Sequence, residues 1–146
     1  MLSVSVREEF PSLVSKARII RVVKTAAKYE PKITGAVEIC TVSREKIKKI
    51  NARYRGINKV TDVLSFAWQE GTRFPGTATL GELYISPQKI VAQAREFNVS
   101  AEEEYIRMLI HGLLHLVGYD HMIKKDAQEM FALQEKIVAE IFSQKN

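Results

Sequence analysis

The sequence predicts a single α+β domain in which a small, mixed, four-stranded sheet packs with about five helices. The chain has 146 residues, the length of one ordinary domain, and 46% hydrophobic with 27% charged residues is a globular composition. Strand-like segments with a period of two are separated by segments with a helical period, and one pair of strands is joined by a loop. We therefore expect one domain over residues 1–146, with strands and helices packed around a common core.

Four segments are predicted to be strands. Leu2, Val4 and Val6 alternate with serines, which is the pattern of a half-buried strand. β-Branched and aromatic residues mark the later segments. The strands are expected at residues 2–6, 36–42, 61–68 and 80–85. The segment GTRFPGTAT, with the turn signal Pro75-Gly76, is expected to be a loop between the last two.

Five helices are expected, and three of them have clear start signals. Ser43 and Ser86 stand at N-cap positions, and Pro87 follows Ser86 in the first turn, where proline is tolerated. Ser100 and Glu103 have the spacing of a capping box. With the caps included, the helices are expected at residues 11–29, 43–54, 86–97, 100–117 and 125–143.

The charge distribution favours a polyanionic partner. The net charge is +5, but residues 1–59 hold 14 Lys and Arg against 5 Asp and Glu, whereas residues 60–146 hold 8 against 12. A basic surface of this kind suits nucleic acid, although solvated helix faces would give the same composition. No apolar run approaches the roughly 20 residues of a membrane helix. The first ten residues lack a secretion signal, and a single Cys40 excludes an internal disulfide, so we expect a cytoplasmic protein.

All three histidines fall in one segment, HGLLHLVGYDH, as His111, His115 and His121. On a helical wheel the first two lie nearly opposite the apolar stripe of residues 100–117, which disfavours a role as core histidines. Side chains four residues apart on a helix are neighbours, so both imidazoles can bind one ion about 2 Å from each nitrogen. Gly118 permits a left-handed backbone that would return His121 to the same point.

Three neutral imidazoles without a fourth protein ligand are typical of an open catalytic zinc site. The fourth position would hold water, whose pKa a metal can lower from about 15.7 to about 7. The competing interpretation is that these histidines are merely exposed helix and loop residues. Metzincin proteases share the spacing of the histidines and the glycine, but Gly112 stands where the protease has its glutamate base. Peptide hydrolysis is therefore disfavoured, whereas attack on an ester or phosphodiester is compatible with the site.

Arg55 is the candidate phosphate-binding residue. It stands at the end of the most basic helix, before Gly56, and its planar guanidinium can bind a phosphate through two hydrogen bonds. The alternative is a surface arginine favoured by the helix dipole. Asp62 is interpreted as a turn or strand-start residue, and Asp120 as either a loop cap or a residue that orients an imidazole.

Together, HGLLHLVGYDH, YRGINKVTDVLSF and LGELYIS resemble the YbeY family of bacterial metal-dependent endoribonucleases over essentially the whole chain. The resemblance implies an α+β fold, one zinc ion per chain on His111, His115 and His121, and a functional arginine at Arg55. It further implies a cytoplasmic endoribonuclease for single-stranded RNA that acts in maturation of the 3′ end of small-subunit ribosomal RNA and in ribosome quality control. The implied partners are ribosomal RNA and the small ribosomal subunit, with no membrane and no DNA.

The sequence departs from the family pattern at four positions. Asn58 and Val60 replace an acidic residue and a proline, Ala67 replaces a proline, and Glu82 replaces an aspartate. Glu82 keeps the carboxylate with a reach longer by one methylene, and no catalytic role is assigned to it. Two alternatives to an endoribonuclease are considered: a metal-stabilised RNA- or ribosome-binding module with little catalysis, and a metallopeptidase-like hydrolase.

Overall fold

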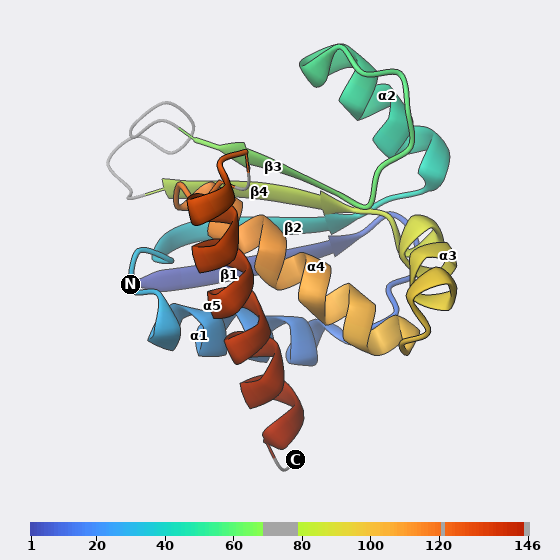
Figure 1. Ribbon diagram of the computed structural model, residues 1–146. Coiled ribbons are helices and arrows are strands. Elements are labelled where there is room, and N and C mark those ends of the chain that lie inside the picture. Colours follow the sequence, from blue (N-terminus) through green and yellow to red (C-terminus); the bar gives the residue numbers. More distant parts are fainter. Residues whose placement is uncertain (69–78, 121, 145–146) are drawn as a thin grey trace.

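The computed structural model describes residues 1–68, 79–120 and 122–144, and these residues form a four-stranded sheet with five helices (Figure 1). The elements are β1 (Leu2–Glu8), α1 (Lys16–Tyr29), β2 (Gly35–Thr41), α2 (Arg44–Arg55), β3 (Val63–Ala67), β4 (Thr79–Ile85), α3 (Pro87–Phe97), α4 (Ala101–Leu116) and α5 (Lys124–Ser143). The predicted α+β class with a mixed four-stranded sheet is therefore confirmed. The predicted loop GTRFPGTAT lies outside the described residues except for Thr79, which begins β4.

The strand order in the sheet is β1-β2-β4-β3. β1, β2 and β4 are parallel, and β3 runs antiparallel to β4 at one edge. β3 begins at Val63, two residues later than the pattern predicts, because the chain bends at Asp62. At this bend the Asp62 side chain accepts a hydrogen bond from the Val63 N–H at 2.7 Å. This edge strand is the part of the sheet that lies nearest to the histidine helix α4 and to the end of α2.

Each face of the sheet has its own core. On one face, buried residues of β2 and β4 such as Ile39 and Leu83 pack with α1, α4 and α5. On the other face, Cys40 and Leu64 pack with α2 through Ile47 and other apolar side chains. Figure 1 shows α4 crossing the sheet with α5 in front of it, and α2 at the end of the sheet where β3 begins. The two cores hold α2 and α4 on either side of β3.

The predicted helix starts are mostly confirmed. Three serines accept a hydrogen bond from a backbone N–H in the first turn: Ser43, Ser86 and Ser100. The prediction for the first helix is wrong by five residues, since α1 begins at Lys16 rather than at Pro11. The Ser12 hydroxyl bonds the carbonyl of Val14 at 2.7 Å and holds a turn there, and Val14 enters the core from this turn. Because Val14 is buried but precedes the helix, the helical pattern of apolar residues in the sequence begins earlier than the helix itself.

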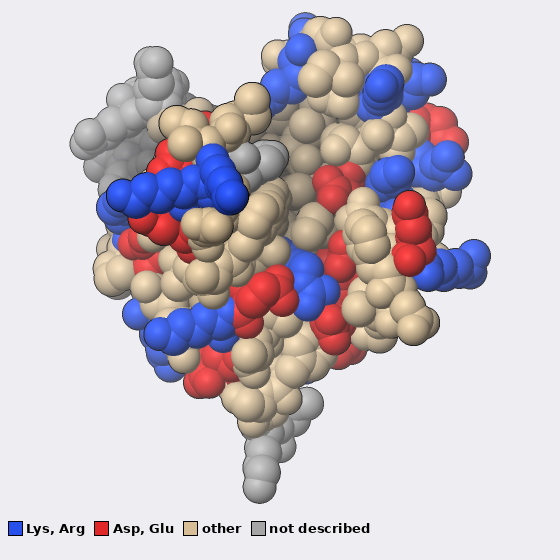
Figure 2. Space-filling model, in the orientation of Figure 1, with Lys and Arg blue, Asp and Glu red and all other residues tan. Residues whose placement is uncertain are grey.

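Basic side chains gather over α2, the upper right element in Figure 2. They are Arg44, Lys46, Lys48, Lys49, Arg53 and Arg55. Among the described residues, no helix has both the length and the apolar character that are needed to cross a bilayer. The basic helix thus lies on an exposed surface beside the edge strand β3.

Candidate metal centre

α4 places His111 and His115 on successive turns, with the edge of one ring toward the face of the other. The two Nε2 atoms are 3.1 Å apart, and the ring centroids are 4.6 Å apart at an interplanar angle of 80°. Two nitrogens that each bind one zinc ion at a tetrahedral angle lie about 3.3 Å apart, since zinc–imidazole bonds are about 2.0–2.1 Å. The observed separation of the Nε2 atoms therefore fits two imidazoles that share one ion.

The surroundings of these histidines are more enclosed than the helical wheel predicts. α4 buries residues around most of its circumference: Glu104, Tyr105, Ile106, Leu109, Ile110, Gly112, Leu113, Leu114 and Leu116. The reason is that β3, β4, α1, α3 and α5 all contact this helix. His111 and His115 are consequently half-buried rather than fully exposed, which restricts the ring orientations that they can adopt.

Gln134 of α5 fixes the tautomer of His111. Glu135 accepts two hydrogen bonds from Arg107, and these bonds lower the pKa of the Glu135 carboxyl, which is therefore ionised and can only accept. The Gln134 amide nitrogen donates to Glu135 at 3.1 Å, so the Gln134 oxygen is the atom 2.7 Å from His111 Nδ1. Because that oxygen only accepts, His111 Nδ1 carries a proton, and in the neutral ring that metal binding requires the lone pair is on Nε2, which faces His115.

Sequence reasoning missed Gln134, although a signal was present. Gln134 is 4% exposed and lies four residues after the buried Met130 and three before the buried Ile137, on the core side of α5. A polar residue in an apolar stripe requires a buried hydrogen-bond partner. That signal marks Gln134 as important, but only the packing of α5 against α4 shows that the partner is His111.

The predicted third ligand, His121, lies outside the described residues. Its neighbours are well fixed: Gly118 has a φ of 103° just after α4, as the sequence predicts, and the Tyr119 hydroxyl donates to Glu30 at 2.7 Å. The Asp120 carboxylate accepts from the Met122 N–H at 3.0 Å, which supports its interpretation as a loop cap. Within residues 1–68, 79–120 and 122–144, no three His, Cys, Asp or Glu side chains are grouped to hold a metal ion.

Gly112 lies where α4 approaches the sheet closely. A Cβ at this position would lie 3.0 Å from Leu83 and 3.1 Å from Val63. Next to it, the Ser65 hydroxyl of β3 donates to the Gly112 carbonyl at 3.1 Å. A side chain at this position would be directed at Leu83 and Val63 of the sheet.

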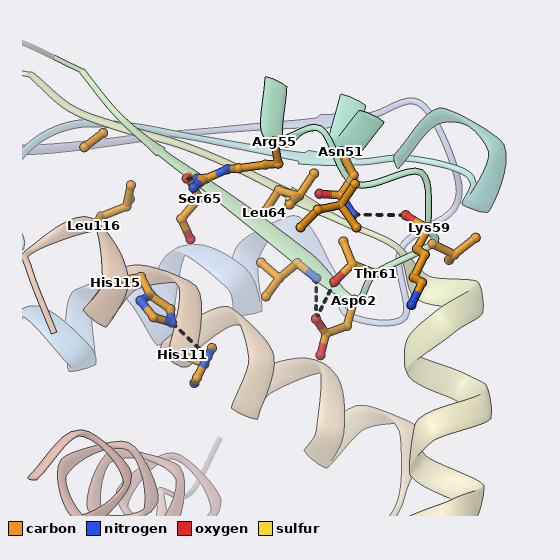
Figure 3. Close-up of a pocket in the computed structure, with 14 residues that line it drawn as sticks. Asn51, Arg55, Lys59, Thr61, Asp62, Leu64, Ser65, His111, His115 and Leu116 are labelled. Carbon is orange, nitrogen blue, oxygen red and sulfur yellow. Dashed lines mark hydrogen bonds between the residues drawn. The ribbon is translucent and has the colours of Figure 1, made fainter. Parts of the chain in front are cut away.

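Arg55 meets the histidine pair across a cavity of about 690 Å³. Its guanidinium donates to the Ser65 carbonyl (Figure 3). The guanidinium carbon also lies 4.9 Å from the centroid of the Phe66 ring. These contacts hold the arginine at the cavity wall, with other N–H groups left to bind an anion. The structure thus brings together Arg55, His111 and His115, three of the four predicted site residues.

The loop between α2 and β3 forms another wall of this cavity. The left-handed backbone of Gly56, with φ 70°, ends α2 as predicted. The buried Asn51 donates to the Lys59 carbonyl at 3.0 Å and so fixes the loop, and Lys59 and Asp62 both line the cavity. Asp62 accepts from the backbone of Val63, in agreement with its predicted role at the start of a strand. Lys59 adds a second basic side chain to the cavity wall.

Glu82 has a structural partner on its own strand. The Tyr84 hydroxyl donates to the Glu82 carboxylate at 3.3 Å. Burial and the neighbouring Glu82 raise the pKa of Tyr84 to about 12.

The fold and the site define an α+β protein with a histidine pair and an arginine on the walls of one cavity. The sequence pattern of the family described as "Endoribonuclease YbeY" matches residues 5–142. The chain therefore belongs to the YbeY endoribonuclease family.

Individual relatives agree with this assignment. Proteins named "Endoribonuclease YbeY" are 40% identical in Thermodesulfovibrio yellowstonii, 37% in Brevibacillus brevis and 46% in Ureaplasma parvum. The alignments cover 72%, 84% and 68% of this chain, and 66%, 84% and 63% of the respective relatives. The solution structure of TM1509 from Thermotoga maritima matches with a TM-score of 0.64 and 32% identity, over 97% of this chain and 90% of that one.

Proposed function

We propose that this protein is a cytoplasmic, zinc-dependent endoribonuclease that cleaves single-stranded RNA, with one zinc ion per chain on His111, His115 and His121. The observation that carries the proposal is the pair of Nε2 atoms 3.1 Å apart on the wall of a cavity that Arg55 and Lys59 also line. An imidazole whose other ring nitrogen donates to a fixed acceptor, as that of His111 does to Gln134, is a typical zinc ligand. The basic cavity wall suits the phosphate of RNA.

Different residues of the chain have different roles in the proposed reaction. Gln134 keeps the His111 Nε2 lone pair turned toward His115. Arg55, held by Ser65 and Phe66, binds a phosphate oxygen and stabilises the negative charge that grows there. The basic side chains of α2 bind the backbone on either side without reading its sequence. A bound zinc ion supplies Lewis acidity and lowers the pKa of a water ligand.

The cellular substrate that we propose is the 3′ end of small-subunit ribosomal RNA, in ribosome maturation and quality control. This step rests on the family membership. It is tested with an RNA that spans the mature 3′ end and its single-stranded extension: we expect cuts in the extension and none when a complementary strand pairs it. Cuts of equal rate in the paired extension would contradict single-strand specificity. A 2′,3′-cyclic phosphate on the product would identify the ribose hydroxyl as the nucleophile and exclude direct attack by water.

The decisive experiment combines metal content with cleavage on the same samples. We expect about one zinc per chain and RNA cleavage in the wild type, and loss of both in His115→Ala. Melting curves in a chelator control for the fold of the variant. A zinc-loaded wild type that binds single-stranded RNA and leaves it intact would instead favour a metal-stabilised binding module. Chelator-sensitive cleavage of an unstructured protein, with RNA untouched, would indicate a metallopeptidase.

A further inference from the structure

A second cavity of about 610 Å³ lies directly beside the first, among α3, α4 and α5. Asp62 and His111 line both cavities and so form the ridge between them. A ligand whose phosphate occupied the first cavity would therefore have its neighbouring groups within reach of the second. In RNA, the group attached next to a backbone phosphate through the ribose is a nucleobase.

Part of the wall of this second cavity is apolar and aromatic. Phe97 at the end of α3 and Phe131 on α5 both line it and are 61% and 43% exposed. Val99 and Met108 complete the apolar wall. Exposed phenylalanine rings beside a nucleic-acid site are stacking surfaces for unpaired bases. Phe131 is nearly parallel to the His111 ring, with centroids 6.2 Å apart, so the aromatic wall continues up to the ridge.

The polar part of the cavity consists mainly of acceptors. Gln93 donates its amide N–H groups to Asp62 at 3.1 Å and to the buried Glu104 at 2.8 Å. Since both partners are carboxylates, the amide oxygen of Gln93 must face away from them as a further acceptor. Arg107 also lines the cavity, but its guanidinium already donates hydrogen bonds to three carboxylates, those of Glu103, Glu104 and Glu135. The hydrogen bond to Glu135 raises the pKa of Arg107.

The charges that line the two cavities favour a phosphate in the first and a nucleobase in the second. The first cavity is lined by Arg55 and Lys59 with Asp62. The second is lined by three carboxylates, those of Asp62, Glu104 and Glu135, and by Arg107, which already pairs with Glu104 and Glu135. An RNA phosphate is repelled from the second cavity and attracted to the first. A neutral base with N–H donors on its edge fits the aromatic walls and the acceptors together.

We propose that the second cavity is a nucleobase subsite for the nucleotide next to the phosphate at the metal centre, with guanine preferred. The inference rests on the proposed function, since that function places the phosphate. Guanine presents two adjacent donors, N1–H and the 2-amino group, to carboxylate and amide oxygens. Uracil presents one N–H between two carbonyl oxygens, which these acceptors repel.

The test compares two labelled eight-nucleotide RNAs, one of uracil alone and one with a single internal guanine, by fluorescence anisotropy on the zinc-loaded protein. The anisotropy is read directly after mixing, before cleavage sets in, and gels of samples taken at the same time define the interval in which each RNA is still intact. In the wild type, we expect the guanine-containing RNA to bind roughly fivefold or more tightly than the uracil RNA. Replacing guanine by inosine, which keeps the stacking area but lacks the 2-amino group, should remove much of this preference.

Phe97→Ala is the test variant, because Phe97 is mostly exposed and its loss leaves the fold intact. It should reduce the guanine preference to about twofold or less. The matched control is Phe142→Ala, another exposed phenylalanine, at the far end of α5, which should keep the preference.

Equal binding of the two RNAs by the wild type, or an undiminished preference in Phe97→Ala, would overturn the subsite. RNA cleavage without any guanine preference would overturn the subsite and leave the proposed function standing. A guanine preference without cleavage would support the subsite and contradict the proposed endoribonuclease function.

Discussion

Replacing Gln134 by methionine tests whether α5 controls the affinity of the histidine pair for zinc. Methionine has nearly the same length but neither donates nor accepts strongly. The change removes the acceptor 2.7 Å from His111 Nδ1 and the donor to Glu135, both at a position that is 4% exposed. His111 is then free to rotate or to move its proton to Nε2, the nitrogen that would bind the ion.

The expected loss of zinc affinity is about 10- to 100-fold, the range for removal of a hydrogen-bond partner behind a metal-binding histidine. In free energy this is about 1.4 to 2.7 kcal/mol of binding. The metal-free protein should also lose about 1–3 kcal/mol of unfolding free energy, because the His111 N–H is left half-buried without its acceptor. Zinc affinity is measured by competition with a chelator, and stability by urea unfolding without metal.

Gln128→Met is the matched control, since Gln128 lies on the same helix and is exposed. Its zinc affinity and stability should equal those of the wild type. A Gln134→Met protein that folds and binds zinc with wild-type affinity would refute the role of Gln134 in orienting His111.

Three further predictions concern other parts of the molecule. Arg55→Lys should keep its zinc content but cleave single-stranded RNA about tenfold or more slowly, since an ammonium cannot replace the planar guanidinium; wild-type turnover would remove Arg55 from the mechanism. Gly81→Ala should lower the unfolding free energy by about 1–3 kcal/mol in a urea titration, because the new Cβ would lie 2.3 Å from the Phe66 carbonyl oxygen, and wild-type stability would contradict this. The hydrogen bond from Tyr119 lowers the pKa of Glu30, so the stability that this bond provides is present above the ordinary pKa of about 4.3 and is lost as the pH falls through the lowered value. Glu30→Gln should therefore lose less stability than the wild type between pH 5 and pH 3, and equal losses in urea unfolding at the two pH values would contradict the assignment.

The sequence was a reliable guide where local chemistry decides the structure. The serine caps at Ser43, Ser86 and Ser100 act through backbone groups three residues away, so their sequence spacing is sufficient to predict them. The juxtaposition of His111 and His115 follows in the same way from the helical repeat.

Features that depend on packing between distant elements could not be predicted from the sequence. The hydrogen bond from His111 to Gln134 joins residues 23 positions apart on two helices. The contact between Arg55 and Ser65 depends on β3 taking the edge of the sheet beside α2. The strand order β1-β2-β4-β3 is itself a tertiary outcome, since many orders bury the same apolar faces.

The most direct test of the metal centre is the zinc X-ray absorption spectrum of the zinc-loaded wild-type protein. The proposed site predicts three imidazole nitrogens at about 2.0–2.1 Å and one further light ligand from solvent. A fit with two or fewer imidazoles, or with sulfur from the buried Cys40 in the first coordination sphere, would contradict a site formed by His111, His115 and His121.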